Sequence, residues 1–502
     1  LLYLTSCAVR RMYGHIEYMK CSPFLLEMGT EGVKAIGHLP SSYRQSGFHG
    51  GDYGERVHDG NFCANGLLLP DRTVQPEMAE VRYYYQPVRF VNVDSESGVI
   101  EIRNFFLFTD PMEKYDFYWT LKRNDTVLRE GLLEPVSIPC VDGKTNQPGC
   151  VTVRIPLDWQ EEDLRAGCEY FLNLSMILRE DDGLLPAGHT AAIEQFELHP
   201  ELPAAAAQSY PALDCARKNG QTILTGESFT AAFDEETGRL VRYEADGRAL
   251  ITPGEGPKGS FFRAATDNDS GFGYGLFVFN APWKTAGEYE VSSCEVRAEK
   301  DRAVITVSGA YPGLNGLRLD TVYTVYGDGA IAAQVTITPQ YDSRFVYVPV
   351  AGMQLTVPGA YERIIFFGRG PEENYIDRAN GTKVGLWETT VTDNFVPYMK
   401  SSETGNRTGV RWIALRDAEG FGLLAAAGDQ PMEVSALHYT AEELDRRVHP
   451  YELNPLSDTI LRLNAVQIGL GGDNAWSRIV THEQYLPHDE TYQYSFILSP
   501  LK

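Results

Sequence analysis

Apolar and polar residues alternate over much of the chain from about residue 87 onward, which is the two-residue period of β-strands. Residues 99–103 and 151–155 alternate strictly, and residues 117–121 lead into a turn at 123–125. Residues 170–178 form a more continuously apolar run, which predicts a more buried strand. Short strands at this spacing predict an immunoglobulin-like sandwich for this part of the chain.

Strands resume after residues 199–212, where Pro and Ala gather without periodicity and predict a linker. The clearest signal is a hairpin over residues 319–337 with Asp328-Gly329 at its tip. One face of its second strand is apolar, with Ile331, Ala333, Val335 and Ile337. So many strands in one domain predict a large twisted antiparallel sandwich, because a single open sheet of that size would curl or split.

Two stretches depart from the strand pattern. Thr440 and Glu443 have the spacing of a helix N-terminal capping box, which predicts one short helix in a chain where helix is otherwise scarce. Residues 1–48 show neither a strand nor a helix period, and we leave them unassigned, as a segment that is either disordered or not genuine.

Composition and charge narrow the class of protein. The 502 residues include 28 Tyr and 23 Phe, which favour strands, and 47 Gly and 28 Pro, which favour turns. The net charge of −24 argues against nucleic acid and against an anionic membrane surface as partners. The sequence contains no run of about 18 apolar residues, so no membrane span is predicted. We expect a cytoplasmic bacterial protein.

The eight cysteines are scattered and form no CxxC pair, so a zinc site is not predicted. Cys140 and Cys150 could close a loop, but a chain of this size does not need such a staple. Free thiols in a reducing compartment are the better interpretation.

Five polar loops, each with an aromatic residue, are the candidate sites of chemistry. They are loop 1 (49–67), loop 2 (262–271), loop 3 (366–378), loop 4 (401–412) and loop 5 (469–477). Sugars bind by stacking their C–H faces on aromatic rings and by pairing their hydroxyls with carboxylates and amides. The alternative is that Asn, Asp and Gly simply form turns in these loops.

The order and spacing of several motifs in residues 49–502 resemble the C-terminal half of β-galactosidases of glycoside hydrolase family 2. These motifs read GGDYGE, NFCANGL, PDRT, TDNDSGFG, GRGPEENYIDR and GLGGDNAWS. The resemblance implies that residues 49–80 are the remnant of a catalytic (β/α)8 barrel. It implies an immunoglobulin-like fourth domain over residues 81–200. Residues 213–502 would be the fifth domain, the family's small-chain domain, a β-supersandwich similar to galactose mutarotase.

The resemblance also implies the chemistry. The family hydrolyses terminal non-reducing β-D-galactose residues, as in lactose, with retention of configuration, by two Glu carboxylates about 5 Å apart. Both Glu lie upstream of the matched stretch, so we expect no catalytic residue in this chain and no activity from it alone. Glu17 and Glu27 lie in the unmatched segment, and we nominate neither.

Three residues match binding positions of the family, and a fourth, His58, stands at such a position where it departs from the family's Asn. The Phe62 backbone carbonyl and the Asn65 side chain match two ligands of a sodium ion, and hard oxygen ligands suit such a cation. Trp476 matches a platform for the glucose or aglycone, and His58 lies at a position near the family's magnesium ion or its water. Because other ligands of the Na⁺ and Mg²⁺ sites are missing, we expect both sites to be incomplete here.

The resemblance implies β-galactoside sugars, a catalytic barrel domain or subunit, and further copies of the full-length chain as partners. One alternative is a non-catalytic small subunit that completes a β-galactosidase in trans. Another is a mutarotase-like carbohydrate-binding module, which would need an acid and a base facing one cleft. His438 and His449 are present for that purpose, but no mutarotase motif surrounds them.

Overall fold

The computed structural model separates into two compact units, Leu1–Gln45 and Ser46–Lys502. The described residues are 49–63, 66–69, 72–204, 208–270, 283–284, 286–340, 347–471, 486–487 and 489–502, with the backbone of 9–12 and 15–18. In the first unit they form a hairpin of β1 (Val9–Met12) and β2 (His15–Tyr18).

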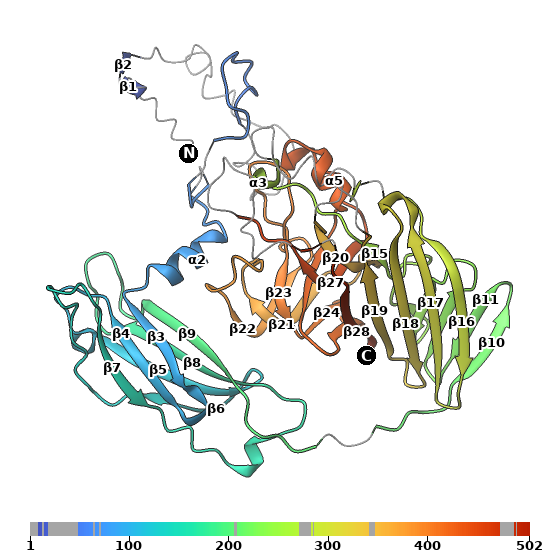
Figure 1. Ribbon diagram of the computed structural model, residues 1–502, viewed down its shortest axis with the longest axis horizontal. Coiled ribbons are helices and arrows are strands. Elements are labelled where there is room, and N and C mark those ends of the chain that lie inside the picture. Colours follow the sequence, from blue (N-terminus) through green and yellow to red (C-terminus); the bar gives the residue numbers. More distant parts are fainter. Residues whose placement is uncertain are drawn as a thin grey trace. The chain divides into compact units, whose positions relative to one another are not determined.

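In the second unit every described strand pairs with its neighbours in antiparallel fashion, and Figure 1 labels most of these strands. The predicted all-β class is therefore confirmed. No helix in the described ranges has both the length and the apolar character needed to cross a membrane. The six cysteines in those ranges are free thiols.

The first sandwich has seven strands in two sheets, in the three-plus-four arrangement of an immunoglobulin-like domain. One sheet has the order β3 (Val88–Asp94), β4 (Val99–Asn104), β7 (Gly149–Arg154). The other has the order β6 (Thr126–Leu132), β5 (Tyr115–Arg123), β8 (Tyr170–Leu178), β9 (Thr190–Leu198). Alternate residues of β5, among them Phe117, Trp119 and Leu121, are buried between the sheets, as the period-two pattern predicts.

The described residues of the second sandwich form three sheets around one core. The first has the order β10 (Asp214–Lys218), β11 (Gln221–Thr225), β12 (Phe229–Asp234), β13 (Leu240–Ala245), β14 (Arg248–Ala249). The second, here called the polar sheet, has the order β15 (Lys258–Ser260), β20 (Val350–Val357), β27 (Thr459–Gln467), β26 (Met432–Leu437), β23 (Arg407–Val410).

The third sheet has nine strands, which continue from one hairpin to the next across the core. Its order is β16 (Glu290–Ala298), β17 (Arg302–Tyr311), β18 (Leu317–Tyr326), β19 (Ile331–Thr338), β28 (Tyr492–Leu501), β25 (Gly422–Ala427), β24 (Trp412–Arg416), β21 (Arg363–Gly370), β22 (Lys383–Thr390). The final strand, β28, thus lies between elements that come much earlier in the chain.

The hairpin predicted over residues 319–337 is confirmed as β18 and β19. In β19, Ile331, Ala333 and Ile337 have no exposed surface, and Val335 is 1% exposed. Burying an Ile or Val side chain contributes about 1.5–3 kcal/mol, so this face anchors the strand to the core.

The polar sheet is unusual because both of its faces are buried. Met353, Val434 and Leu463 point into the hydrophobic core. Their neighbours in sequence point the other way, and Glu433 and Asn464 on that face are only 4% and 1% exposed. Polar side chains taken out of water must find partners, so this second face needs a polar cover.

Among the residues that the structure describes, helices are few and short. They are α2 (Glu77–Tyr84), α3 (Asp267–Ser270), α5 (Ala441–Arg446) and the 3₁₀ turns η2 (Ser95–Ser97), η3 (Pro111–Glu113), η4 (Glu161–Asp163), η7 (Pro312–Leu314) and η8 (Pro450–Glu452). The predicted cap of α5 is confirmed, because the Thr440 hydroxyl accepts the Glu443 N–H at 3.1 Å. The Glu443 carboxylate does not return to the cap and instead binds Arg446 and Arg447.

Helix α2 was not predicted, because it has no apolar face and none of its residues is buried. It is held by its acidic residues. Glu77 Oε1 lies 2.9 Å from Arg378 Nη1, and Glu80 Oε2 accepts the Gly381 N–H at 2.8 Å. The helix therefore docks on residues 378–381 through these polar contacts and through close packing of Gly381 against its backbone.

Gly381 gives a direct test of this docking. A Cβ built on Gly381 would lie 2.3 Å from the Ala79 backbone, so Gly381→Ala has to push α2 away. We expect a loss of about 1–3 kcal/mol of docking energy and faster amide exchange in α2, measured by hydrogen–deuterium exchange. Gly143→Ala is the control, because nothing lies within 4 Å of its added Cβ. Unchanged exchange in α2 of Gly381→Ala would contradict the docking described here.

Candidate functional site

The five polar loops singled out in the sequence contact one another, although they are far apart in the chain. Loop 1 meets loop 2 where Asn61 Nδ2 donates to Asp267 Oδ1 at 2.6 Å. Loop 2 meets loop 5 where Asn268 Nδ2 donates to the Leu470 carbonyl at 2.7 Å. Loop 3 meets loop 5 at Asp377, whose Oδ2 accepts the N–H groups of Leu470 and Gly471, each at 2.8 Å.

Arg263 of loop 2 lies at the centre of these contacts and has no exposed surface. Its guanidinium binds both oxygens of Asp269, at 3.0 and 2.9 Å. It also donates to the carbonyls of Ile468 and Gly469, at 2.5 and 2.8 Å. Burial opposes the charged guanidinium, but the Asp269 carboxylate outweighs it and raises the pKa of Arg263. One buried cation thus ties loop 2 to the start of loop 5.

Glu373 performs the same role between loops 3 and 4. Its Oε2 accepts the Gly405 N–H at 2.5 Å and the Thr404 hydroxyl at 3.2 Å. Its Oε1 lies 2.5 Å from Arg378 Nη2 and also contacts the Tyr398 hydroxyl. Because Arg378 also binds Glu77, the same cluster holds helix α2.

Two further acids are buried at the polar sheet. Glu433 lies on the polar face of the sheet, and Glu403 lies in loop 4, which covers that face. Arg462 Nη1 lies 3.2 Å from Glu403 Oε2, and both side chains are almost fully buried. Burial raises the pKa of Glu403, although Arg462 and Arg263 oppose the shift. Burial raises the pKa of Glu433 to about 8, since Asn406 and the Gln467 amide offset it only in part. Shifts of this kind concentrate at functional sites, but structural networks also produce them.

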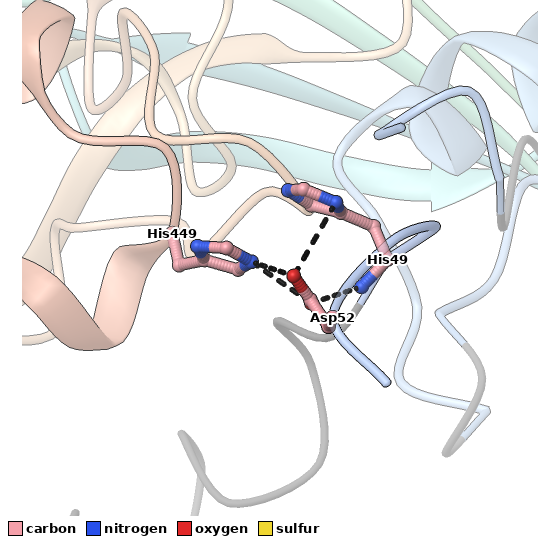
Figure 2. Close-up of side chains that lie close together, drawn as sticks. All are labelled: His49, Asp52 and His449. Atoms are coloured by element: carbon pink, nitrogen blue, oxygen red, sulfur yellow. Dashed lines mark hydrogen bonds and ion pairs between the residues drawn. The ribbon is translucent and has the colours of Figure 1, made fainter. Parts of the chain in front are cut away.

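A second cluster joins loop 1 to the turn η8, and Figure 2 shows its three side chains. His449 Nε2 lies 2.9 Å from Asp52 Oδ2, and the His49 backbone N–H donates to the same carboxylate at 2.7 Å. The rings of His49 and His449 stack with centroids 4.2 Å apart and an 8° angle between their planes. Burial raises the pKa of Asp52, but these hydrogen bonds and both histidines lower it by more.

His49, Asp52 and His449 offer donor atoms within 4.8 Å of one another, a set that could in principle hold a metal ion. Imidazole nitrogens bind a metal along lone pairs in the plane of the ring. Two rings stacked in nearly parallel planes cannot both aim these lone pairs at one ion between them. The arrangement therefore fits a His–Asp hydrogen bond supported by ring stacking, which fastens loop 1 to η8.

The structure places two of the predicted metal residues. The His58 ring packs on the Gly50–Gly51 turn, where an added Cβ on Gly51 would lie 2.8 Å from the ring, and its Nδ1 accepts the Gly60 N–H at 3.2 Å. The Phe62 side chain is 48% exposed and so is not part of the core. Asn65 and Trp476 lie outside the described residues. The sodium, magnesium and sugar roles of these residues remain predictions.

The sequence did not predict the contact between Asp52 and His449, although loop 1 was named as a candidate site and contains both His49 and Asp52. His449 was considered only as a mutarotase candidate, and here it binds Asp52. His438, the other candidate, has both ring nitrogens against protein oxygens, the Glu362 carboxylate at 3.0 Å and the Asp458 carbonyl at 3.2 Å.

Family models match most of the chain. Residues 225–498 match the β-galactosidase small chain, residues 100–199 match β-galactosidase domain 4, and residues 36–90 match the TIM barrel domain of glycosyl hydrolases family 2. The last match begins inside the segment that the sequence left unassigned. The chain belongs to the glycoside hydrolase family 2 β-galactosidases and corresponds to their C-terminal portion.

Individual relatives agree. A β-galactosidase of Priestia megaterium is 35% identical over 487 residues, which cover 95% of this chain and 44% of the relative. One of Lactobacillus delbrueckii subsp. bulgaricus is 30% identical, with the same two coverages. The chain thus spans less than half the length of these relatives. Among solved structures, a galactose mutarotase related enzyme from Lactobacillus acidophilus aligns with 56% of this chain and 97% of its own, at 8% identity and a TM-score of 0.33.

The segment from α5 to η8, which carries His449, depends on the charge of Glu443. Burial opposes that charge, but Arg447, Arg446 and Asn454 lower the pKa of Glu443 from 4.5 to about 2. A depressed carboxylate pKa contributes stability that is present above the unfolded value and lost as pH falls toward the folded one. We therefore expect Glu443→Gln to lower the melting temperature at pH 7, with the gap to wild type closing between pH 4.5 and 2.

Thermal unfolding followed by circular dichroism measures this gap at each pH. Glu442→Gln is the neighbouring control, and we expect it to change the melting temperature little, because its carboxylate makes no described ion pair or hydrogen bond. A gap of constant size from pH 7 to pH 2 would contradict the ionic role of Glu443.

Proposed function

We propose that this chain is the C-terminal part of a β-galactosidase that hydrolyses terminal non-reducing β-D-galactose residues by a retaining mechanism with two Glu. In this proposal the 502 residues contain no catalytic pair. They supply the immunoglobulin-like domain and the supersandwich, which support a catalytic barrel and present Trp476 to the glucose or aglycone of the substrate.

The observation that carries the proposal is the anchoring of loop 5. Leu470 and Gly471, which precede Trp476 by a few residues, donate their N–H groups to Asp377, and Gly469 is held by Arg263. A fixed loop base limits where a Trp beyond it can reach, which is what a sugar platform requires. Loop 1, which belongs to the barrel match, is fastened to the same region by Asn61 and by Asp52.

A small subunit that acts in trans is the second candidate. The match of residues 225–498 to a β-galactosidase small chain favours it, whereas the barrel match at residues 36–90 favours a single longer protein. Co-purification of the chain with a barrel-bearing partner at fixed stoichiometry would support the subunit. Partners, substrate and the incomplete Na⁺ and Mg²⁺ sites of Phe62, Asn65 and His58 belong to the proposal in either form.

The proposal is tested with the purified 502-residue chain. We expect no hydrolysis of o-nitrophenyl galactoside above the buffer rate, but weak lactose binding in saturation-transfer NMR with the signal concentrated on the glucose ring. Trp476→Ala should weaken this binding roughly fivefold, because stacking on an aromatic ring contributes on the order of 1 kcal/mol.

Asp214→Ala serves as a control, since Asp214 lies on the exposed edge strand β10 and should leave lactose binding unchanged. Robust hydrolysis that survives the double substitution Glu17→Gln and Glu27→Gln would overturn the proposal. Lactose binding that Trp476→Ala leaves intact would overturn the platform role of that residue.

A further inference from the structure

The polar face of the polar sheet holds a group of buried oxygens that sequence comparison does not assign. Glu433 of β26 stands directly opposite Asn464 of β27, so their side chains share this face. On the other side Asn464 stands opposite Gly352 of β20. A Cβ on Gly352 would lie 2.0 Å from Asn464 Oδ1, so the glycine leaves the space that this amide oxygen occupies.

A β-bulge brings a second amide to the same face. The register of β20 and β27 shifts between Ala351 and Gly352, which places Val466 opposite Ala351 and Gln467 opposite Val350. The extra residue inverts the alternation, so Gln467 follows Asn464 onto the polar face although the two are three positions apart. Gln467 and Asn464 are each 1% exposed.

Strands β26 and β27 and loop 4 meet at Glu433. Asn406 Nδ2 of loop 4 donates to Glu433 Oε2 at 3.0 Å, and the Gln467 backbone N–H also binds this carboxylate. Asn406 is fully buried, and Glu433 is 4% exposed. Asn406 and the Gln467 backbone thus bind one buried carboxylate, and Asn464 stands opposite it on the neighbouring strand.

Most of the polar atoms in the side chains of Asn406, Asn464 and Gln467 have no hydrogen-bond partner. In the described part of the chain, no hydrogen bond reaches Asn406 Oδ1 or either side-chain polar atom of Asn464 and Gln467. Because neither end of the Asn464 and Gln467 amides is bonded, each amide can flip and present its oxygen to a ligand. Buried polar groups are almost always satisfied, so an unmatched set of this size points to a bound species.

The charge balance indicates the sign of that species. Arg263 and Arg462 are matched by Asp269 and Glu403. Within the described ranges Glu433 forms no ion pair with any Arg, Lys or His. Arg407 does not serve it, because Arg407 pairs with Val434 in register and lies over the Phe366 ring at 5.7 Å, on the opposite side of the sheet.

We propose that Glu433, Asn406, Asn464 and Gln467 form a buried binding site for one monovalent alkali cation. Carboxylate and amide oxygens are the ligands that hard cations prefer. A single positive charge neutralises the single carboxylate, which minimises the cost of burying the site. Without the cation, burial raises the pKa of Glu433 to about 8, so the site would hold a proton at neutral pH, and the bound cation releases that proton to the solvent. This site uses other residues than the predicted sodium ligands Phe62 and Asn65 and does not depend on the proposed function.

The test compares the thermal stability of the full chain in NaCl, in KCl and in choline chloride at equal ionic strength. We expect one or both alkali salts to raise the wild-type melting temperature by about 3 °C or more over choline. Glu433→Gln should lose most of this increment, because Gln keeps the shape but removes the charge. Ser435→Ala, on the same strand and face, should retain it.

An equal alkali increment in wild type and Glu433→Gln would overturn the proposal, and so would a wild type that responds only to MgCl₂ or CaCl₂. A second measurement covers the case in which Glu433→Gln fails to fold. Crystals of the unaltered chain soaked in RbCl should show an anomalous peak beside Glu433 and Asn464. Water density alone at that position would overturn the proposal.

Discussion

The charged hydrogen bonds of Arg263 are the interaction on which the loop region depends. A guanidinium withdrawn completely from water is tolerated only when nearly all of its N–H groups have acceptors. Arg263 meets this condition with the Asp269 carboxylate and with the carbonyls of the two residues that follow β27. The same atoms that satisfy the charge therefore fix the position of loop 2 against loop 5.

The polar sheet explains why such an arrangement exists in this fold. One face of the sheet completes the hydrophobic core, and the other carries Glu433, Asn464 and Arg462. The loops that cover this second face have to supply charges and amides rather than apolar side chains. The family's loop motifs are thus explained by burial as well as by any contact with sugar. FFGRGPEENYIDR in particular supplies Glu373 and Arg378, which clamp loop 4 and helix α2.

The sequence was sufficient for the parts of the fold that depend on local pattern. The strands at residues 170–178 and the hairpin at 319–337 follow from alternation and turn chemistry, and the cap of α5 follows from Thr440. The convergence of the loops could not be predicted in this way, because Asn61 and Asp267 are 206 positions apart and meet only through the folded sheets. Helix α2 was missed because polar docking leaves no periodic signal.

Amide exchange after Arg263→Met tests most directly whether the loops form one cooperative unit. Leu470 and Gly471 bond to Asp377 rather than to Arg263, and Thr408 bonds to Asn374. If the buried charges hold the loops together, exchange should accelerate at all three of these amides and stay unchanged in β8 of the other sandwich. Faster exchange confined to residues 264–269 would contradict the account.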